Sequence, residues 1–492
     1  MKQRAAVIGA GLGGLAAACL LSAKGYRVTV FEKNDSAGGK MQEFNKAGYR
    51  FDTGPSLLTM PFILERLFEE CGSQITEYLT LTEPETLCRY FYPDDTRFDS
   101  YSDPDKTVKE IRRFAPEDAD AYGQFLKKAE KLYERTSEAF LFNPLFSFSD
   151  LKHLNFSDFL KIDAFSTVSE SVDQQFKSPY LRQFFKRFTT YTGSSPYQAP
   201  ATLNVIPHTE LNMGGFYVKG GIYTIAKSLQ KLAEENGTDF RFNCRVDGIL
   251  INKKMITGIR LQNGEIIKTD YCFANSDATD TLLNLMPEGL LPEKRKARQA
   301  SLEPSGSGFV LLLGCSRQWE QLRHHNIFFS PDYEQEFDDI FKKKKLPENP
   351  TVYIANTSFS DPGHAPAGSS NLFVLVNAPY IQPSGLTDKD VDTYYADFII
   401  DELEKRGLTG LRGSIEVQKI LTPADFLNTY GSNRGSIYGT SSNSRLSAFM
   451  RPRNKLRGFK NLYQVGGSTH PGGGIPLVIQ SAFNAVQLLQ RN

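Results

Sequence analysis

The apolar positions at the beginning of the chain predict a strand, a helix and a second strand. Residues 4–8 form a short apolar run, and residues 15–24 carry apolar side chains at helical spacing before Gly25 ends the helix. Residues 27–32 are rich in β-branched and aromatic side chains, as strands are. Parallel strands joined by a helix cross over in the right-handed sense, so we expect one right-handed β-α-β unit.

Similar patterns recur along the rest of the chain. Apolar positions at helical spacing predict helices over residues 61–71, 116–140, 223–236 and 477–489. Runs of strand-forming residues predict strands over residues 240–249, 255–261 and 271–274. Because 492 residues exceed the usual size of one domain, we expect an α/β protein with more than one structural unit.

Composition and charge restrict the kind of protein. Hydrophobic residues make up 40% of the chain, which is enough for a large core. Lys and Arg number 57 and Asp and Glu number 56, so the net charge of +1 argues against nucleic acid as the main partner. The cysteines form no C-x-x-C pair and the histidines lack H-E-x-x-H spacing, so we expect neither a disulfide framework nor a metal site. The pair His324-His325 is expected at the surface.

No apolar run predicts a membrane-spanning helix, which needs roughly 18–20 apolar residues in succession. The first apolar run, residues 5–21, is interrupted by four glycines, which is atypical of a signal peptide. We therefore expect a cytoplasmic protein that is either soluble or attached to a membrane surface.

The turn between the first strand and the first helix carries a dinucleotide-binding pattern. Gly9, Gly11 and Gly14 have the spacing G-x-G-x-x-G. In that order, these glycines allow the tight turn, the close approach of a pyrophosphate and the packing of the helix on the strand. The N-terminus of the helix, around Leu12 and Gly13, then directs its N–H groups toward the phosphates.

An acidic residue and two more glycine-bearing loops follow the second strand. Glu32 stands at the end of the strand, where a carboxylate accepts hydrogen bonds from ribose hydroxyls and disfavours a 2′-phosphate. The loops contain Gly38-Gly39-Lys40-Met41 and Gly54-Pro55-Ser56. Loops this close to the fingerprint indicate a long dinucleotide that passes several segments, and we expect the Lys40 ammonium to pair with its pyrophosphate.

These motifs resemble the opening of the carotenoid desaturases of the phytoene desaturase type, within the flavin amine oxidase-like superfamily. The family combines the glycine fingerprint with E-K, G-G-(R/K) and D-x-G-P-(T/S) motifs, which here are Glu32-Lys33, Gly38-Gly39-Lys40 and Asp52-Thr53-Gly54-Pro55-Ser56. Lysine replaces the commoner arginine at position 40. The resemblance implies that the cofactor is FAD and that these segments, together with Met41, contact it.

The C-terminal region matches the family independently. Residues 461–476 predict a strand, a glycine-rich loop and the start of a helix, and they include Gly467, His470 and Gly474-Ile475-Pro476. In the family this segment lies against the ribityl chain and the flavin ring. We interpret His470 as a residue that orders the loop, with a catalytic base as the alternative.

Flavin contacts at both ends of the chain imply a Rossmann-like FAD-binding domain assembled from discontinuous segments. By resemblance, Val246 lies near the adenine and Asn275 near the cofactor. The segments of the FAD-binding domain are expected to be residues 1–65, 205–300 and 446–492. The segments of a mixed α+β substrate domain are expected to be residues 66–204 and 301–445.

Within the substrate domain, residues 135–200 are expected to form a helical, aromatic-rich cap. Four phenylalanines fall within residues 140–148, and others follow with basic residues between them. They form either a Phe-rich core or a membrane-contacting patch with its basic residues at the lipid headgroups. The four lysines at positions 342–345 are either a solvated loop or an attraction for anionic lipid.

The resemblance implies that the chain is an enzyme that oxidises a carotenoid. FAD would take one hydrogen as hydride at flavin N5, and the other would leave the adjacent carbon as a proton. The sequence identifies no catalytic side chain, and the electron acceptor stays open between oxygen and a quinone. Residues 38–41 and 54–60 resemble most closely the branch that introduces a 3,4 double bond into hydroxylated or monocyclic carotenoids.

Several alternatives stay open. Phytoene desaturase and dehydrosqualene desaturase are alternatives within the family, and a carotenoid cis-trans isomerase would keep the flavin without net oxidation. A soluble amine oxidase is a further rival. A prenyl-protein escort reuses the two-domain fold without catalysis, but the intact glycine pattern argues against it. A substrate that resides in the bilayer would require peripheral association with the inner face of the membrane.

Overall fold

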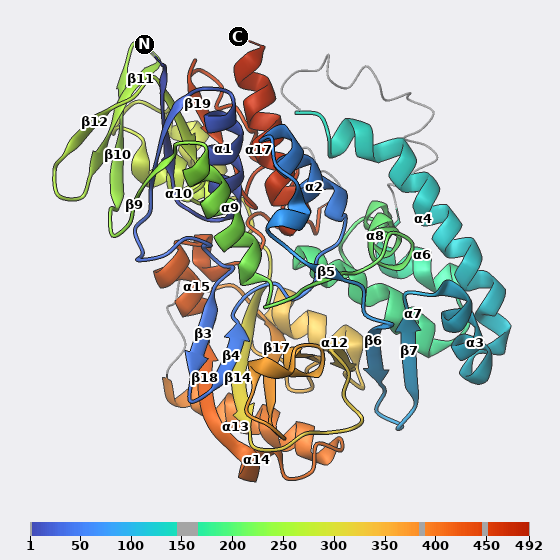
Figure 1. The fold of residues 1–492 in the computed structure, drawn as a ribbon. Helices are drawn as coiled ribbons and strands as arrows, with labels where there is room; N and C mark the ends of the chain where they lie inside the picture. The colour runs from blue at the N-terminus through green and yellow to red at the C-terminus, as the bar shows by residue number, and fades with distance from the viewer. Residues whose placement is uncertain (1, 145–165, 383–388, 445–450, 492) are drawn as a thin grey trace.

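Strand β1 (Arg4–Ile8) lies at the centre of a five-stranded parallel sheet. Its neighbours are β2 (Arg27–Phe31) and β13 (Tyr271–Ala274), and the outer strands are β9 (Asp239–Arg241) and β19 (Leu462–Gln464). The strand order β19-β13-β1-β2-β9 therefore joins segments from the beginning, the middle and the end of the chain. Figure 1 shows the two ends of the chain side by side at this part of the molecule.

The structure is a computed structural model, and it describes all residues except 1, 145–165, 383–388, 445–450 and 492. Among the described residues no helix is long and apolar enough to cross a membrane. The mixed helices and sheets of the structure agree with the predicted α/β fold class.

Helix α1 (Leu12–Ala23) is the most deeply buried helix beside the five-stranded sheet. All of its residues from Leu12 to Ser22 are buried. Helices α17 (Ile475–Gln490) and α9 (Tyr223–Glu235) pack against it, and α2 (Pro61–Glu70) packs on α1 and α17. A helix covered on every side is apolar all round, which explains why α1 consists almost entirely of Leu, Ala and Gly.

The single strand predicted over residues 240–249 is wrong. The structure contains β9 and then β10 (Val246–Asn252), which belong to different sheets. Between them Asn243 adopts a left-handed conformation (φ 54°) and donates its N–H to Asn34 O, which turns the chain away. Strand β10 pairs with β11 (Met255–Leu261), and β12 (Ile266–Lys268) completes a three-stranded antiparallel sheet.

A seven-stranded sheet forms the lower half of the molecule in Figure 1. Its strands, in spatial order, are β18 (Ile415–Leu421), β14 (Ser307–Cys315), β17 (Ser370–Ala378), β16 (Val352–Asn356), β15 (His325–Phe328), β6 (Thr86–Phe91) and β7 (Arg97–Tyr101).

Strand β14, which lies between β18 and β17, is buried along its whole length because both faces of this sheet are covered. Successive side chains of a strand point to opposite faces. Phe309 and Leu311 lie in one apolar cluster with residues of helix α13 (Lys389–Lys405). Val310 and Leu312 lie in another with the hairpin of β3 (Glu43–Lys46) and β4 (Tyr49–Asp52).

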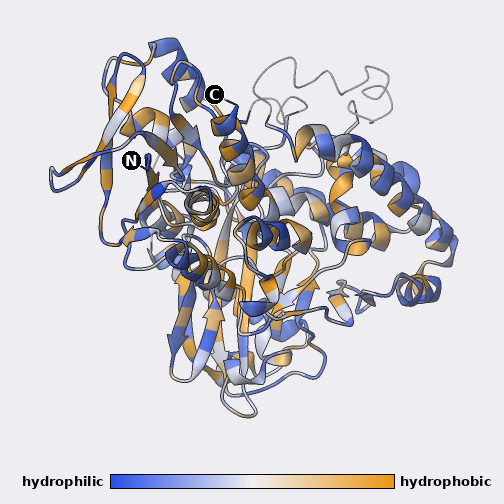
Figure 2. Ribbon diagram, turned by 45° about the horizontal axis from the view of Figure 1, so that its top comes forward, coloured by the Kyte–Doolittle hydropathy of each residue, from blue (hydrophilic) through white to orange (hydrophobic). Residues whose placement is uncertain are grey.

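Helices form a layer beside the β6–β7 edge of this sheet. Figure 2 shows that these outer helices alternate between hydrophilic and hydrophobic residues, as amphipathic helices do. The layer consists of α3 (Pro104–Phe114), α4 (Ala119–Phe140), α6 (Val168–Gln175), α7 (Pro179–Lys186) and α8 (Ile206–Leu211). The remaining named helices and strands of interest are β5 (Leu81–Thr82), β8 (Tyr217–Val218), α10 (Ala278–Asp280), α11 (Glu293–Ala300), α12 (Tyr333–Asp338), α14 (Leu411–Ser414) and α15 (Pro423–Tyr430).

The described part of the predicted cap is a Phe-rich core. Phe184, Phe185 and Phe188 are buried in one cluster with aromatic residues of β6, β7 and α4. The membrane-contacting interpretation is therefore wrong for these three side chains, because lipid cannot reach them. The phenylalanines at positions 146–165 lie outside the described residues.

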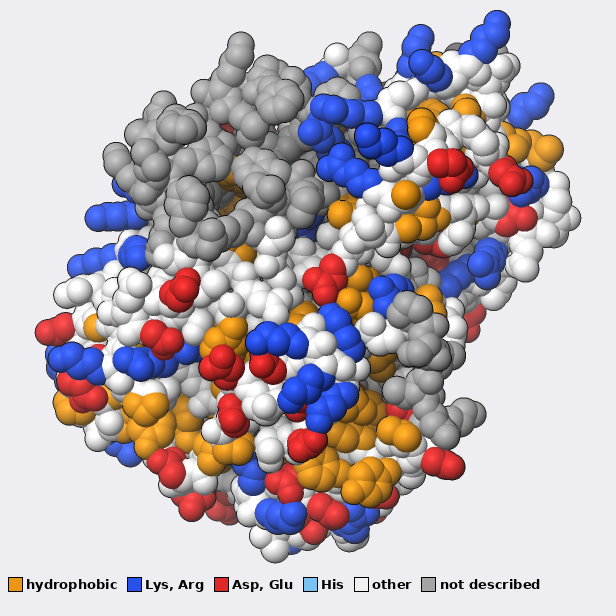
Figure 3. Space-filling view, turned by 180° about the vertical axis from the view of Figure 1, so that it is seen from behind, with side chains coloured by type: hydrophobic (Ala, Val, Ile, Leu, Met, Phe, Trp, Pro, Cys, Tyr) orange, Lys and Arg blue, Asp and Glu red, His pale blue; other side chains and the backbone are white. Residues whose placement is uncertain are grey.

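The four lysines at 342–345 each pair with a carboxylate of the chain. Lys342 pairs with Asp338, Lys343 with Asp339, Lys344 with Glu303 and Lys345 with Glu348. The run is therefore largely neutralised by its own neighbours. Seen from behind, the lower half of the molecule carries hydrophobic side chains interspersed with charges of both signs (Figure 3).

Candidate functional site

The turn between β1 and α1 is held in shape by glycine. Gly9 has a φ of 93° and donates its N–H to Phe31 O at 2.8 Å. A Cβ on Gly14 would lie 2.0 Å from Gly9 O, far inside van der Waals contact. The first and third glycines of the fingerprint thus allow the backbone of α1 to pack directly on the end of β1.

The N-terminus of α1 meets the loop that follows β2. Gly11 is the N-cap residue of α1, and no side chain caps the helix. Gly38 donates its N–H to Ala10 O at 2.8 Å, and a Cβ on Gly39 would lie 3.0 Å from Gly11 Cα. An uncapped helix end lined by glycine backbone is the arrangement that receives a phosphate.

Asn275 and Gly466 follow β13 and β19, which lie on the opposite side of β1 from β2, and they pack against the same turn. Asn275 donates its N–H to Ile8 O at 2.8 Å, and its amide lies 2.8 Å from where a Cβ on Gly11 would stand. A Cβ on Gly13 would lie 2.7 Å from Gly466 N. Gly467 was among the predicted cofactor contacts and Gly466 was not. The adjacent glycines after the last strand were a usable signal of a turn, and in the structure Gly466 has a φ of 102°.

Glu32 is buried at the end of β2 and holds two backbone groups. Its Oε2 accepts a hydrogen bond from Ala10 N at 2.7 Å and its Oε1 accepts one from Asn34 N at 2.9 Å. Two carboxylate oxygens offer about four acceptor positions, so capacity remains for ribose hydroxyls. Val246, predicted near the adenine, is buried at the start of β10 in an apolar cluster with Phe31.

The two lysines of the predicted site donate to backbone carbonyls. Lys40 Nζ donates to Ile437 O at 2.6 Å and to Ser436 O at 3.2 Å. Burial lowers the pKa of Lys40 to about 8, and the charge of Asp277 partly opposes this. Lys33 Nζ donates to Asn428 O of α15 at 3.2 Å. Pairing of Lys40 with the pyrophosphate and contact of Lys33 with the cofactor both stay predictions.

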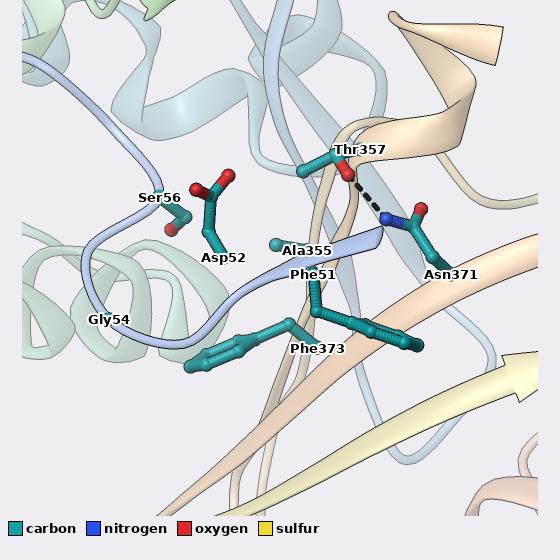
Figure 4. A pocket seen from close by; sticks show the side chains of 8 residues that line it. All are labelled: Phe51, Asp52, Gly54, Ser56, Ala355, Thr357, Asn371 and Phe373. Atoms are coloured by element: carbon teal, nitrogen blue, oxygen red, sulfur yellow. Dashed lines mark hydrogen bonds between the residues drawn. The ribbon is translucent and has the colours of Figure 1, made fainter. Parts of the chain in front are cut away.

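The segment Gly54-Pro55-Ser56 lies between the glycine loops and the seven-stranded sheet. A Cβ on Gly54 would lie 2.1 Å from Lys40 O, so glycine is needed there, and Met41 beside it is buried. Ser56 lies beside a small pocket between this segment and strands β16 and β17 (Figure 4). The pocket is lined by Phe51, Asp52, Gly54, Ser56, Ala355, Thr357, Asn371 and Phe373.

The prediction that His324 and His325 lie at the surface is wrong. They are only 1% and 3% exposed, because His325 begins β15 inside the seven-stranded sheet. His325 Nδ1 is 2.7 Å from Tyr353 Oη, which in turn is 2.5 Å from Ser56 Oγ. Burial lowers the pKa of His324 to about 4 and lowers that of His325 as well, so both imidazoles are neutral near neutral pH.

The C-terminal glycine loop leads to a second uncapped helix end. Gly474 (φ 100°) is the N-cap residue of α17, no side chain caps the helix, and Ile475 and Pro476 form its buried first turn. His470 Nε2 lies 3.1 Å from Asn143 O, and burial lowers the pKa of His470 to about 4. This contact is what a loop-ordering histidine would make.

The segments around 9–14, 38–40, 275 and 466–476 therefore meet at two helix N-termini. Crowded glycines, uncapped N–H groups and a buried carboxylate fit a dinucleotide with a pyrophosphate and a ribose. The described residues contain no group of three or more His, Cys, Asp or Glu that could hold a metal ion.

Comparison with known proteins decides the family. A family described as flavin-containing amine oxidoreductase matches residues 12–490. The chain belongs to this family. It is also 36% identical, over 98% of its own length and 97% of the relative's, to a 4,4′-diaponeurosporene oxygenase of Staphylococcus aureus (strain bovine RF122 / ET3-1). The predicted FAD cofactor and the prediction of an FAD-dependent oxidoreductase are thus confirmed.

Solved structures of low sequence identity share the fold. A double mutant of putrescine oxidase is 13% identical with a TM-score of 0.64, and the match covers 100% of both chains. The RAB GDI of Plasmodium falciparum is 13% identical with a TM-score of 0.58, over 100% of this chain and 99% of that one. Membership of the flavin family excludes the escort alternative, since the chain is an enzyme.

Proposed function

We propose that this flavoenzyme oxidises a long, linear carotenoid. The observation that carries the proposal is the full-length similarity to 4,4′-diaponeurosporene oxygenase, at 36% identity over 98% of the chain. Because the similarity spans residues of both the glycine-lined site and the seven-stranded sheet, it supports a related substrate as well as a shared cofactor.

Two oxidations of such a substrate are candidates. Oxygenation of the carotenoid comes first, since it is the activity in the name of the similar staphylococcal protein. Desaturation of the C-3,4 bond of a hydroxylated or monocyclic carotenoid comes second, and it is favoured by the amino-acid sequence of residues 38–41 and 54–60.

The residues of the chain would bind the cofactor and enclose the substrate. The N-terminus of α1 would hold the pyrophosphate of FAD, and the N-terminus of α17 would lie at its flavin end. Glu32 would hold the ribose. FAD, when bound, supplies the capacity to accept a hydride. A polyene offers no polar group along its length, so its position depends on apolar walls such as Phe51 and Phe373 beside Gly54.

We further propose that the enzyme works at the inner face of the membrane without a spanning helix. Carotenoids reside in the bilayer, so an enzyme with a protected active site must take them from it. The membrane-contacting surface is not assigned to Phe184, Phe185 or Phe188, which are buried.

The test is mass-resolved chromatography of products formed by the FAD-loaded protein with liposomes that contain one carotenoid each: phytoene, lycopene, γ-carotene, a 1′-hydroxy derivative or 4,4′-diaponeurosporene. Gain of oxygen supports the first candidate, and loss of two hydrogens supports the second. A shifted retention time at unchanged mass identifies an isomerase and refutes net oxidation. The matched control is Gly11→Val. The Cβ of a side chain at this position would already lie 2.8 Å from the Asn275 amide, so the variant should lose FAD and form no product.

A further inference from the structure

Arg451 is a buried cation without a carboxylate partner beside the C-terminal glycine loop. Its side chain is 8% exposed. Its Nη2 donates to Ser442 Oγ at 3.0 Å and its Nη1 to Gly467 O at 3.5 Å, and no described carboxylate lies within ion-pair distance of it. Both partners are neutral, so the positive charge of the guanidinium is not balanced by these contacts.

Arg187 shows what a balanced buried arginine looks like in this protein. It is 5% exposed, and its Nη2 lies 2.5 Å from the Glu210 carboxylate. The neighbouring carboxylate raises the pKa of Arg187, whereas burial alone lowers the pKa of Arg451 to about 10. Burial of an unpaired charge is strongly unfavourable. No described carboxylate supplies this counter-charge, and the contrast with Arg187 points to a negative group on a bound molecule.

The surroundings of Arg451 connect it to the cofactor site. A Cβ on Gly472 would lie 3.2 Å from its Cζ, and its partner Gly467 directly follows Gly466, which touches α1. The same loop ends at the uncapped N-terminus of α17, a second source of positive potential. A ligand that begins at α1 and follows this loop therefore arrives between the guanidinium and a helix N-terminus.

The other titratable groups around the loop leave this positive potential in place. Lys40 donates to the carbonyls of residues 436 and 437. These residues are next to the glycine loop, because Tyr438 packs against Gly473. His470 is neutral near neutral pH. The charge of Arg453 helps to lower the pKa of His470. Among the described residues, Asp277 and its neighbour Asp280 are negative groups on this side, and the charge of Asp277 acts on Lys40.

We propose that Arg451, together with the N-terminus of α17, stabilises the negative charge of the reduced flavin ring and so raises the reduction potential of bound FAD. FAD that accepts a hydride gains two electrons and one proton and becomes the anion FADH⁻, while the second substrate hydrogen leaves as a proton. The extra negative charge is delocalised on the ring, and a fixed cation favours that form. Arg451 thus acts through the reduction potential of FAD, and its effect is the same for every substrate that the flavin oxidises.

The test is the reduction potential of the holoenzyme, measured by equilibration with a reference dye in the absence of any carotenoid. Arg451→Gln should lower the potential by about 30 mV or more, which for a two-electron couple is a tenfold change in the equilibrium constant. Arg451→Lys keeps the charge and should restore most of the difference. Arg457→Gln removes an exposed positive charge further along the same segment and should leave the reduction potential unchanged.

Two results would overturn the proposal. One is a wild-type potential in Arg451→Gln at full FAD content. The other is a wild-type potential with weakened FAD binding, which would assign the guanidinium to the pyrophosphate. If Arg451→Gln binds no FAD, the absorbance of reduced wild-type holoenzyme across pH decides. The absorbance spectrum should remain that of the anionic reduced flavin at every pH. A conversion to the neutral reduced form, as free reduced FAD shows, would refute the proposal. Failure of carotenoid turnover leaves these measurements unaffected.

Discussion

Gly14 offers the sharpest test of how the cofactor turn is built. In Gly14→Ala the new Cβ would lie 2.0 Å from Gly9 O. Carbon and oxygen atoms that are not bonded rarely approach closer than about 3 Å, so α1 and the end of β1 would have to separate by about 1 Å. The movement opposes the hydrogen bond from Gly9 N to Phe31 O, at 2.8 Å, and shifts the helix end that would receive the pyrophosphate.

The magnitude follows from two opposing contributions. Alanine is favoured over glycine inside a helix by about 1 kcal/mol. Overpacking of a rigid site costs about 1–3 kcal/mol, and more where the obstacle is backbone. We therefore expect Gly14→Ala to lower the free energy of unfolding by about 1–2 kcal/mol and to reduce FAD content strongly.

The matched control is Gly123→Ala in α4. Gly123 is also helical, but nothing lies within 4 Å of its added Cβ. The same substitution should therefore raise the free energy of unfolding by up to about 1 kcal/mol and leave FAD content unchanged. The measurements are urea denaturation and the ratio of flavin to protein absorbance. Equal behaviour of the two variants would refute the argument from close packing.

Three further predictions concern buried charged groups. Glu32→Gln should weaken FAD binding at least tenfold in a titration of the apoprotein, because the amide presents a donor to the N–H group of Ala10 or Asn34. Arg187→Met should lower the free energy of unfolding by about 3–5 kcal/mol, because it leaves the buried Glu210 carboxylate without its arginine counter-charge and with only the hydroxyl of Tyr191 as a partner. The double variant with Glu210→Leu should recover part of that loss, and an additive double variant would contradict the coupling. Burial raises the pKa of Glu336 from 4.5 to about 7, so the native protein keeps a proton that the unfolded chain releases, and unfolding free energy should fall by up to about 3 kcal/mol as pH rises from about 4.5 to 7. Glu336→Gln should abolish that decline in urea titrations at several pH values, and an unchanged slope would show that another group causes it.

The part of the fold that could be predicted from sequence is the part fixed by short-range rules. Strand β1 matches the predicted residues, and β2 and α1 nearly do, since glycine spacing, helix periodicity and strand-forming residues agree there. Helix α1 begins at Leu12 rather than at residue 15, because Gly13 and Gly14 take helical conformations that their weak propensity did not indicate.

The remaining features depend on partners that are distant in sequence. Strand β6 lies between β7 and β15, and no local pattern marks its pairing of Tyr90 with Ile327. His324 and His325 are polar residues inside a sheet, and only their strand neighbours reveal that. The surroundings of Arg451 were likewise invisible, because the sequence does not show that no described carboxylate approaches it.

The order of strands β19-β13-β1-β2-β9 has a consequence for biogenesis. The first strand pairs with β13, more than 260 residues later, and β13 pairs with β19 close to the C-terminus. Contacts of such long sequence separation form late, since the intervening loop must first be closed. During translation the nascent chain can fold β1, α1 and β2 as a local unit, but α1 stays without its α17 cover until the last helix has left the ribosome. We therefore expect FAD to bind stably only after α17 has been synthesised, and until then α1 exposes apolar surface of the kind that chaperones bind.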